Sequence, residues 1–123
     1  LEHLHPDDID GHLRTIRRTL RPGGRYVVST PHRYSGPHDI SRHFADEPCG
    51  LHLREWTYAE LEADARAAGF ARLVPFRRGR LRPGRLARLA TGLLERVCGA
   101  VPRRVRRRLT ARLFQSVNAV LEV

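Results

Sequence analysis

The feature that most constrains the fold is a helix–turn–strand unit between Pro6 and Pro31. Its helical part carries an apolar stripe at helical spacing, formed by Ile9, Leu13, Ile16 and Leu20. Pro22 prevents the helix from continuing, and Gly23-Gly24 permit a sharp exit. The next residues, "YVVST", are aromatic and β-branched without apolar–polar alternation at their centre. We therefore expect a helix over 6–20, and a strand over 25–30 that is covered on both faces, as in an α/β sheet.

A second helix and two further strands follow. "TYAELEADARAAGF" has Thr57 and Glu60 at the spacing of a capping box, and Gly69 where a helix should end. Strands are predicted over 70–76 and 116–123, since both segments are short and rich in apolar residues. Between them, residues 86–98 and 103–114 predict two amphipathic helices, which we expect to pack on the sheet with an arginine-rich face in solvent. This order of elements predicts an α/β fold.

Charge divides the chain into two unequal parts. Residues 1–71 carry a net charge of −2, whereas residues 72–123 carry +12, which gives the overall +10. All 23 basic residues are arginines. The second part therefore predicts a surface that attracts anionic partners.

Several classes of protein are disfavoured by simple features of the sequence. No apolar run approaches the roughly 18 residues of a membrane span, and no signal-peptide pattern opens the chain. Cys49 and Cys98 are far apart and do not suggest a disulfide framework, so we expect a cytoplasmic location. Because the chain begins with Leu and contains no Met, we expect it to be a fragment of a longer protein.

Three motifs in order carry a resemblance to a known family. They are "LEHLHPDD", then "LRTIRRTLRPGGRYVVSTPHR", then "WTYAELEADARAAGF". Together they resemble the C-terminal half of a class I S-adenosylmethionine-dependent methyltransferase, in which a strand ending like "LEH" precedes a helix, an "LRPGG" turn and a central strand. A further helix closed by "AGF" and two terminal strands then finish the sheet. The resemblance covers about residues 1–76 and the last strand.

The family's Gly-rich cofactor loop and its ribose-binding acidic residue have no counterpart in the sequence. "RPGGR" is not that loop, because it leads from a helix into a strand, whereas a cofactor loop leads from a strand into a helix. The resemblance thus implies the acceptor-side half of a Rossmann-like methyltransferase that uses S-adenosylmethionine. We expect the isolated 123 residues to bind that cofactor weakly or not at all, and to be inactive.

The resemblance also implies how the single partial domain is organised. Residues 1–76 form the sheet-and-helix part, in which residues 31–56 are a long loop on the substrate side. Residues 77–114 are a basic two-helix insertion, and residues 115–123 are the terminal strand.

Candidate site residues follow from the rule that ligands bind at the carboxyl ends of strands. By the resemblance, Leu1 and Glu2 border the methionine part of the cofactor. A base is needed when the methyl acceptor carries a proton, and His3 and His32 are the candidates for a catalytic base or a substrate contact. The sequence favours a capping or packing role for both histidines over catalysis, because many methyltransferases work chiefly by positioning. The expected substrate contacts are Pro31, His38, His52 and Trp56.

The long loop permits a second interpretation. Cys49 and His52 lie close in sequence, as metal ligands often do, but the spacing of His38 and His43 closes no compact four-ligand pattern. We therefore expect no metal, and favour a loop that covers a substrate. An ordinary surface loop fits the sequence nearly as well.

The basic helices leave alternatives open for function. The main prediction is a methyltransferase acting on a small-molecule or lipid-like acceptor. The alternative is a non-enzymatic basic module that binds nucleic acid or an anionic membrane surface through residues 77–112. Since few aromatic residues flank these helices, we expect no specific nucleic acid, and anionic lipid is the better partner.

Overall fold

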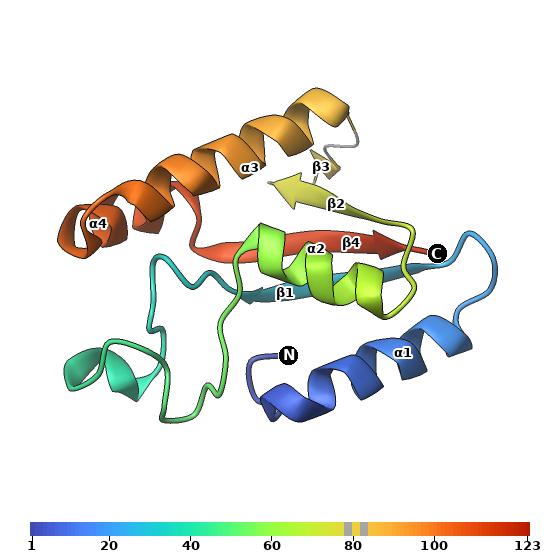
Figure 1. Cartoon of the computed structure of the whole chain (residues 1–123), viewed down its shortest axis with the longest axis horizontal. Helices are drawn as coiled ribbons and strands as arrows, with labels where there is room; N and C mark the ends of the chain where they lie inside the picture. Colours follow the sequence, from blue (N-terminus) through green and yellow to red (C-terminus); the bar gives the residue numbers. More distant parts are fainter. Residues whose placement is uncertain (78–79, 82–83) are drawn as a thin grey trace.

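The computed structural model describes residues 1–77, 80–81 and 84–123. Apart from one two-residue strand and two 3₁₀ helices, its helices and strands follow the order expected from the sequence (Figure 1). The α-helices are α1 (Ile9–Thr19), α2 (Tyr58–Ala67), α3 (Arg85–Ala100) and α4 (Arg103–Leu113). The strands are β1 (Arg25–Pro31), β2 (Arg72–Arg77), β3 (Arg80–Leu81) and β4 (Ser116–Glu122). Two short 3₁₀ helices, Pro6–Asp8 and Ile40–His43, complete the elements.

The strands form one sheet, in which they lie in the order β1-β4-β2-β3. β4, the last strand in the sequence, lies antiparallel between β1 and β2, with Val28 opposite Ala119 and Leu73 opposite Leu121. β1 and β2 therefore run in the same direction. The predictions of strands over 25–30, 70–76 and 116–123 are confirmed within two residues, whereas the two-residue β3 was not predicted.

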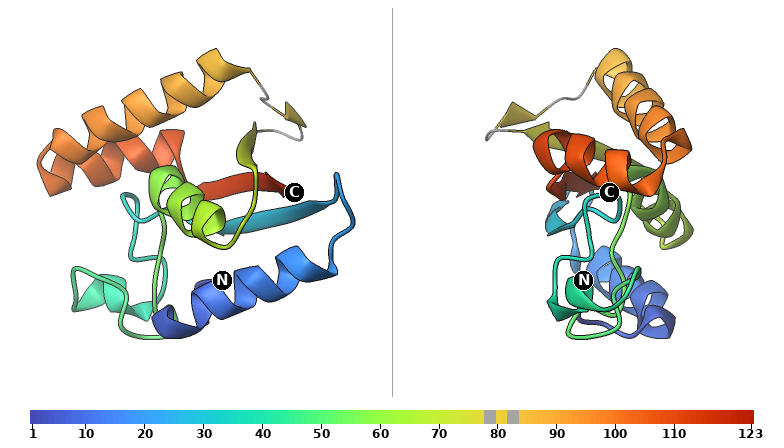
Figure 2. Two further views of the ribbon diagram at one scale, coloured as in Figure 1. Left: turned by 45° about the vertical axis from the view of Figure 1, so that its right-hand side comes forward. Right: turned by 90° about the vertical axis from the view of Figure 1, so that its left-hand side faces the viewer.

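The core lies between the sheet and the helices α1 and α2. Ile9 and Leu13 of α1 pack with Leu61 of α2 against Val28 and other buried strand residues. In the right-hand view of Figure 2, α1 and α2 lie on the same side of the strands. The stripe predicted on the first helix therefore faces the core, although the first turn is 3₁₀ rather than α.

The expectation that β1 is covered on both faces is wrong. Val28 and Thr30 are buried, but Val27, just before them, is 62% exposed, and Ser29, between them, is exposed too. The strand therefore has one buried face and one solvent face. A run of β-branched residues suits either situation, because cover on the second face must come from another element.

α2 begins and ends as the sequence predicts. The Thr57 side chain accepts a hydrogen bond from the Glu60 N–H, and the Glu60 carboxylate accepts one from the Thr57 N–H, which completes the capping box. Gly69 follows with a φ of 95°, a left-handed conformation that favours glycine. This helix is thus fixed locally before it packs on the sheet.

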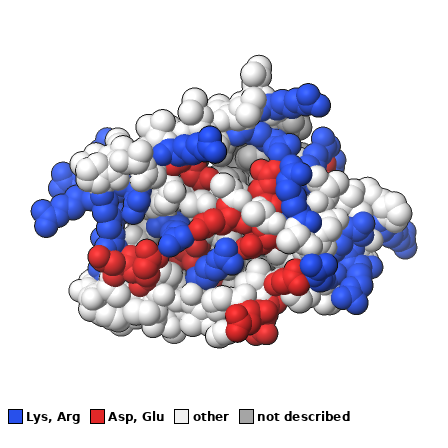
Figure 3. All heavy atoms as spheres, viewed as in Figure 1, with Lys and Arg blue, Asp and Glu red and all other residues white. Residues whose placement is uncertain are grey.

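The two predicted C-terminal helices exist, but their apolar faces do not pack on the sheet. On α3, Leu86, Leu89 and Leu93 are 83%, 69% and 66% exposed. The residues that α3 buries are Glu95 and Cys98. Figure 3 shows the molecule from the same side as Figure 1. Its upper part, where α3 lies, has white atoms of other residues with blue arginines among them, and red acidic side chains are more frequent below. The expectation of a sheet-packed insertion is therefore wrong.

None of the described helices is both long enough and apolar enough to cross a membrane.

Candidate functional site

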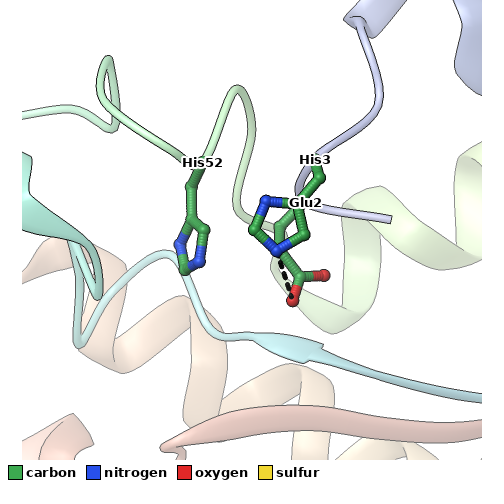
Figure 4. Close-up of side chains that lie close together, drawn as sticks. All are labelled: Glu2, His3 and His52. Atoms are coloured by element: carbon green, nitrogen blue, oxygen red, sulfur yellow. Dashed lines mark ion pairs between the residues drawn. The ribbon is translucent and has the colours of Figure 1, made fainter.

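Three segments that are distant in sequence meet at the carboxyl end of β1. The N-terminal segment carries Glu2 and His3, β1 carries Thr30, and the long loop carries His52. One ligand atom each of Glu2, His3 and His52 lies within 4.8 Å of the other two. We call these three residues the Glu2–His3–His52 cluster. Figure 4 shows the two imidazole rings beside the Glu2 carboxylate, with His52 reaching in from the loop.

Glu2 is held through both its main chain and its side chain. Thr30 Oγ1 donates to Glu2 Oε2 at 2.9 Å, and the Glu2 carbonyl accepts from the Leu53 N–H at 2.7 Å. Burial raises the pKa of this carboxyl group, but hydrogen bonds from its own N–H, from Thr30 and from the Leu1 amino group together hold the pKa below its ordinary value. Glu2 is therefore a carboxylate with one oxygen anchored and the other facing the histidines.

The two histidines of the cluster each use Nδ1 for a structural hydrogen bond. His3 Nδ1 lies 3.0 Å from the Leu51 carbonyl oxygen, and His52 Nδ1 lies 2.9 Å from Glu55 Oε1. Both partners only accept, so these partners assign the proton to Nδ1 in each ring. In the neutral imidazole, Nε2 then carries a lone pair. His3 Nε2 lies 4.0 Å from Glu2 Oε1, and the two rings meet edge to face at 5.1 Å.

Glu55, a residue of the same long loop, orients two of its histidines. It is 2% exposed, and its carboxylate accepts from the Nδ1 atoms of His52 and His38 and from the His38 N–H at 2.7 Å. Burial raises the pKa of Glu55, but these hydrogen bonds lower the pKa by more, so that it lies below its ordinary value. Gly36 leaves the necessary room, because a Cβ there would collide with Glu55 Oε2.

Asp39 fixes the loop that delivers His52. Its two carboxylate oxygens accept from the backbone N–H groups of Ser41 and His52, both at 3.0 Å. Burial raises the pKa of Asp39, but the hydrogen bonds from His52, Ser41 and Leu51 dominate and lower the pKa to about 2. Asp39 is therefore an anion at neutral pH that holds the two ends of the loop 39–52 together.

The cluster can act chemically in two ways. An imidazole Nε2 with a free lone pair can accept a proton from a substrate, and two such nitrogens with a carboxylate oxygen can bind a metal ion. The side chain of His3 is 65% exposed, so the cluster opens to solvent on that side. Among the described residues, Cys49 and His43 take part in no comparable cluster.

His32, the other predicted base, has a different environment. Its ring is completely buried and stacks on Phe114 at 5.0 Å. Nδ1 accepts from the Tyr34 N–H, and Nε2 donates to Glu95 Oε1 at 2.8 Å. Both nitrogens are therefore occupied within the protein. In this arrangement His32 ties β1 to α3.

The remaining predicted site residues lie in several environments. Trp56 is completely buried in the core and donates from Nε1 to Asp64, away from the cluster. Pro31 ends β1 and accepts from the Trp56 N–H through its carbonyl. Leu1 packs against the core. His38 lies beside Glu55, with Nε2 3.1 Å from Ser35 Oγ.

Two buried glutamates were not predicted as site residues. Glu55 lies three residues after His52, and this spacing is the only sequence signal for the pair. Glu95 gives no such signal, because it lies on α3 and reaches the N-terminus of α2, where it accepts from the N–H groups of Tyr58 and Ala59.

Comparisons with protein-family models, with curated proteins and with solved structures found no match to this chain.

Proposed function

We propose that this chain is the acceptor-side part of a class I methyltransferase that uses S-adenosylmethionine and methylates a small-molecule or lipid-like acceptor. The observation that carries the proposal is the convergence at the end of β1. The family resemblance puts the "LEH" residues beside the methionine part of the cofactor, and the end of the "YVVST" strand with the loop after it on the acceptor side. Their contacts through Glu2, Thr30 and His52 support that reading.

The element order supports the finer fold proposal as well. The resemblance calls for two terminal strands that finish the sheet started by the central strand. β2 and β4 pair in one sheet with β1, and β4 hydrogen-bonds to both others. We therefore propose that the sheet is the C-terminal half of a Rossmann-like methyltransferase sheet.

The residues present fit one end of the cofactor. The Glu2 carboxylate, ionised and with Oε1 turned away from Thr30, suits the cationic amino group of the methionine part. When bound, S-adenosylmethionine supplies a methyl group on a positively charged sulfur. The chain's own contribution is to hold the acceptor at the end of β1 and to remove its proton through Nε2 of His3 or His52. Glu55 keeps the His52 ring in the tautomer that accepts the proton.

Transfer of a labelled methyl group tests this assignment. The product of the complete open reading frame should move label from S-adenosylmethionine into a compound extracted from the source cells. Of the two variants His3→Ala and His52→Ala, the one that removes the base should lower the rate of methyl transfer by about 10²-fold or more. The matched control is His43→Ala, since His43 is exposed and its side chain accepts one hydrogen bond from the described residues, that of Arg42. Equal rates in all three variants would contradict the proposed base.

One observation favours a second function, attachment to an anionic membrane surface. The exposed leucines of α3 continue into Val97, and α4 exposes Val105 and Leu109. Among the described residues, Arg104, Arg107 and Arg108 of α4 form no ion pair. An exposed apolar face beside unpaired arginines is the pattern of a helix that lies in a lipid–water interface. A lipid-like methyl acceptor would be reached from the same surface.

Vesicle co-sedimentation tests this second function. The chain should sediment with vesicles that contain phosphatidylglycerol, less so at high salt, and poorly with phosphatidylcholine alone. A variant with Leu86, Leu89 and Leu93 changed to Ser should lose binding. Salt-sensitive binding to RNA without binding to vesicles would instead support the nucleic-acid alternative.

A further inference from the structure

We propose that the Glu2–His3–His52 cluster binds a divalent transition-metal ion, with Zn²⁺ as the probe, through one carboxylate oxygen and two imidazole nitrogens. The sequence favoured no metal, because Cys49, His52, His38 and His43 closed no ligand pattern. The structure replaces that set with ligands from the N-terminal segment and the loop. The inference does not rest on the methyltransferase proposal.

The distances permit coordination after a small closing movement. The three ligand atoms lie within 4.8 Å of one another, whereas metal–ligand bonds of about 2.0–2.2 Å place ligand atoms roughly 3.4 Å apart. His3 can supply the movement, because its side chain is exposed and carries one hydrogen bond, to a loop carbonyl. Glu2 and His52 are anchored and can stay in place.

The surrounding hydrogen bonds point to a metal more specifically than the distances do. Ligating histidines usually donate the second ring N–H to a carbonyl or a carboxylate, which fixes the ring and leaves the other nitrogen for the metal. His3 does so to Leu51, and His52 does so to the buried Glu55. Glu2 is itself held by Thr30 through Oε2, which leaves Oε1 as the ligand oxygen. All three ligands thus have an orienting partner.

The charges around the cluster favour a cation although the chain is strongly basic. Glu2 and Glu55 contribute two carboxylates, and Asp39 holds the His52 backbone. The Leu1 amino group pairs with Glu2 Oε2 at 3.2 Å, but no arginine forms an ion pair with either glutamate in the described part of the chain. Two nitrogens and one oxygen suit Zn²⁺ or a similar transition metal, whereas Mg²⁺ and Ca²⁺ prefer oxygen ligands throughout. Three protein ligands leave a fourth position open toward solvent.

Calorimetric titration of the chain with ZnCl₂ near neutral pH, without S-adenosylmethionine, tests the inference. We expect one saturable site, and a loss of at least tenfold in affinity for His3→Ala, His52→Ala and Glu2→Gln. Glu55→Gln should cost about 10–100-fold, because it removes the partner that orients His52. Controls are His43→Ala and Cys49→Ser, which should bind as the unchanged chain does.

A second readout separates loss of ligand from loss of fold. Co²⁺ bound in place of Zn²⁺ should give visible absorption bands that disappear in His3→Ala, a change on the surface that leaves the circular dichroism spectrum unchanged. Absence of a saturable site would overturn the inference. Undiminished binding in the His3→Ala/His52→Ala double variant would overturn it as well, since the ion would then sit elsewhere. Because no cofactor is present, failure of the zinc titration leaves the methyl-transfer proposal to its own test.

Discussion

At the scale of single residues, Glu95 connects more of the molecule than its position suggests. Its carboxylate accepts from His32 Nε2 at 2.8 Å and from the Tyr58 and Ala59 N–H groups at 2.6 and 3.1 Å. From its place on α3, Glu95 therefore caps the N-terminus of α2. It also accepts the hydrogen bond of the fully buried His32 ring. A carboxylate at a helix N-terminus also complements the helix dipole.

Glu95→Ala should lower the free energy of unfolding by about 3 kcal/mol, because it removes the acceptor of the buried His32 Nε2–H and the carboxylate that caps α2. The control is Glu47→Ala, an exposed partner of Arg33, which should change the value by less than about 1 kcal/mol. Urea unfolding followed by circular dichroism measures both. If the two substitutions lower the free energy of unfolding equally, the hydrogen bonds of Glu95 do not stabilise the fold as proposed.

Glu60 gives a residue-scale prediction about pH. Burial raises its pKa, but hydrogen bonds from Thr57 and the charge of Arg33 lower it below the ordinary 4.5. Because the folded pKa is the lower one, the stability from ionised Glu60 is complete above pH 4.5 and is lost as pH falls through the folded value. Glu60→Gln should therefore be less stable than the unchanged chain at neutral pH, with a difference that shrinks in acid. Urea unfolding across this range measures it, and a pH-independent difference would contradict it.

At the scale of elements, the sequence shows which face of a helix is apolar. Whether that face is buried depends on the element beside it. α1 and α3 show the same apolar periodicity, but α1 buries its stripe and α3 exposes most of its own. The capping box of α2 was predictable because its partners are three residues apart. The contacts of Glu2 with Thr30 and of Glu95 with His32 were not, because they depend on how distant segments meet.

The exposed stripe of α3 predicts an asymmetry between substitutions. Leu89→Ala should change the free energy of unfolding by less than about 0.5 kcal/mol, since Leu89 is mostly in water. Leu61→Ala, in the completely buried face of α2, should cost about 2–5 kcal/mol. Thermal or urea unfolding of both variants provides the comparison. A large effect at Leu89 would mean that the stripe is covered in solution.

At the scale of the whole molecule, β1 is an edge strand of the sheet. In the described part of the chain no strand pairs with its outer edge over Arg25–Thr30, and the Trp56 bridge reaches only His32. An open edge next to a half-exposed sheet face invites pairing with another strand. The sequence pattern of β1 did not reveal that its second face is bare, because cover on that face depends on another element.

Concentration-dependent association should follow from this edge. Val27→Lys places a charge on the bare face beside it and should shift the sedimentation profile toward a single species. The control is Val105→Lys on α4, which is also exposed but far from β1 in sequence. If both variants associate as the unchanged chain does, the edge is not the contact.

The site at the end of β1 could be anticipated only in part. Glu2, His3 and His52 were each named from sequence, but for separate roles. Their meeting depends on the Leu53–Glu2 backbone hydrogen bond and on the anchoring of the loop by Asp39. Neither contact leaves a local pattern in the sequence.

The central claim is that this end of the sheet serves a methyltransferase, and titration calorimetry with S-adenosylmethionine tests it most directly. The product of the complete open reading frame should bind one equivalent. Glu2→Gln should bind at least tenfold more weakly, since it removes the carboxylate charge expected beside the cofactor's amino group. His43→Ala should leave the affinity unchanged. Absence of saturable binding by the unchanged protein would contradict the account.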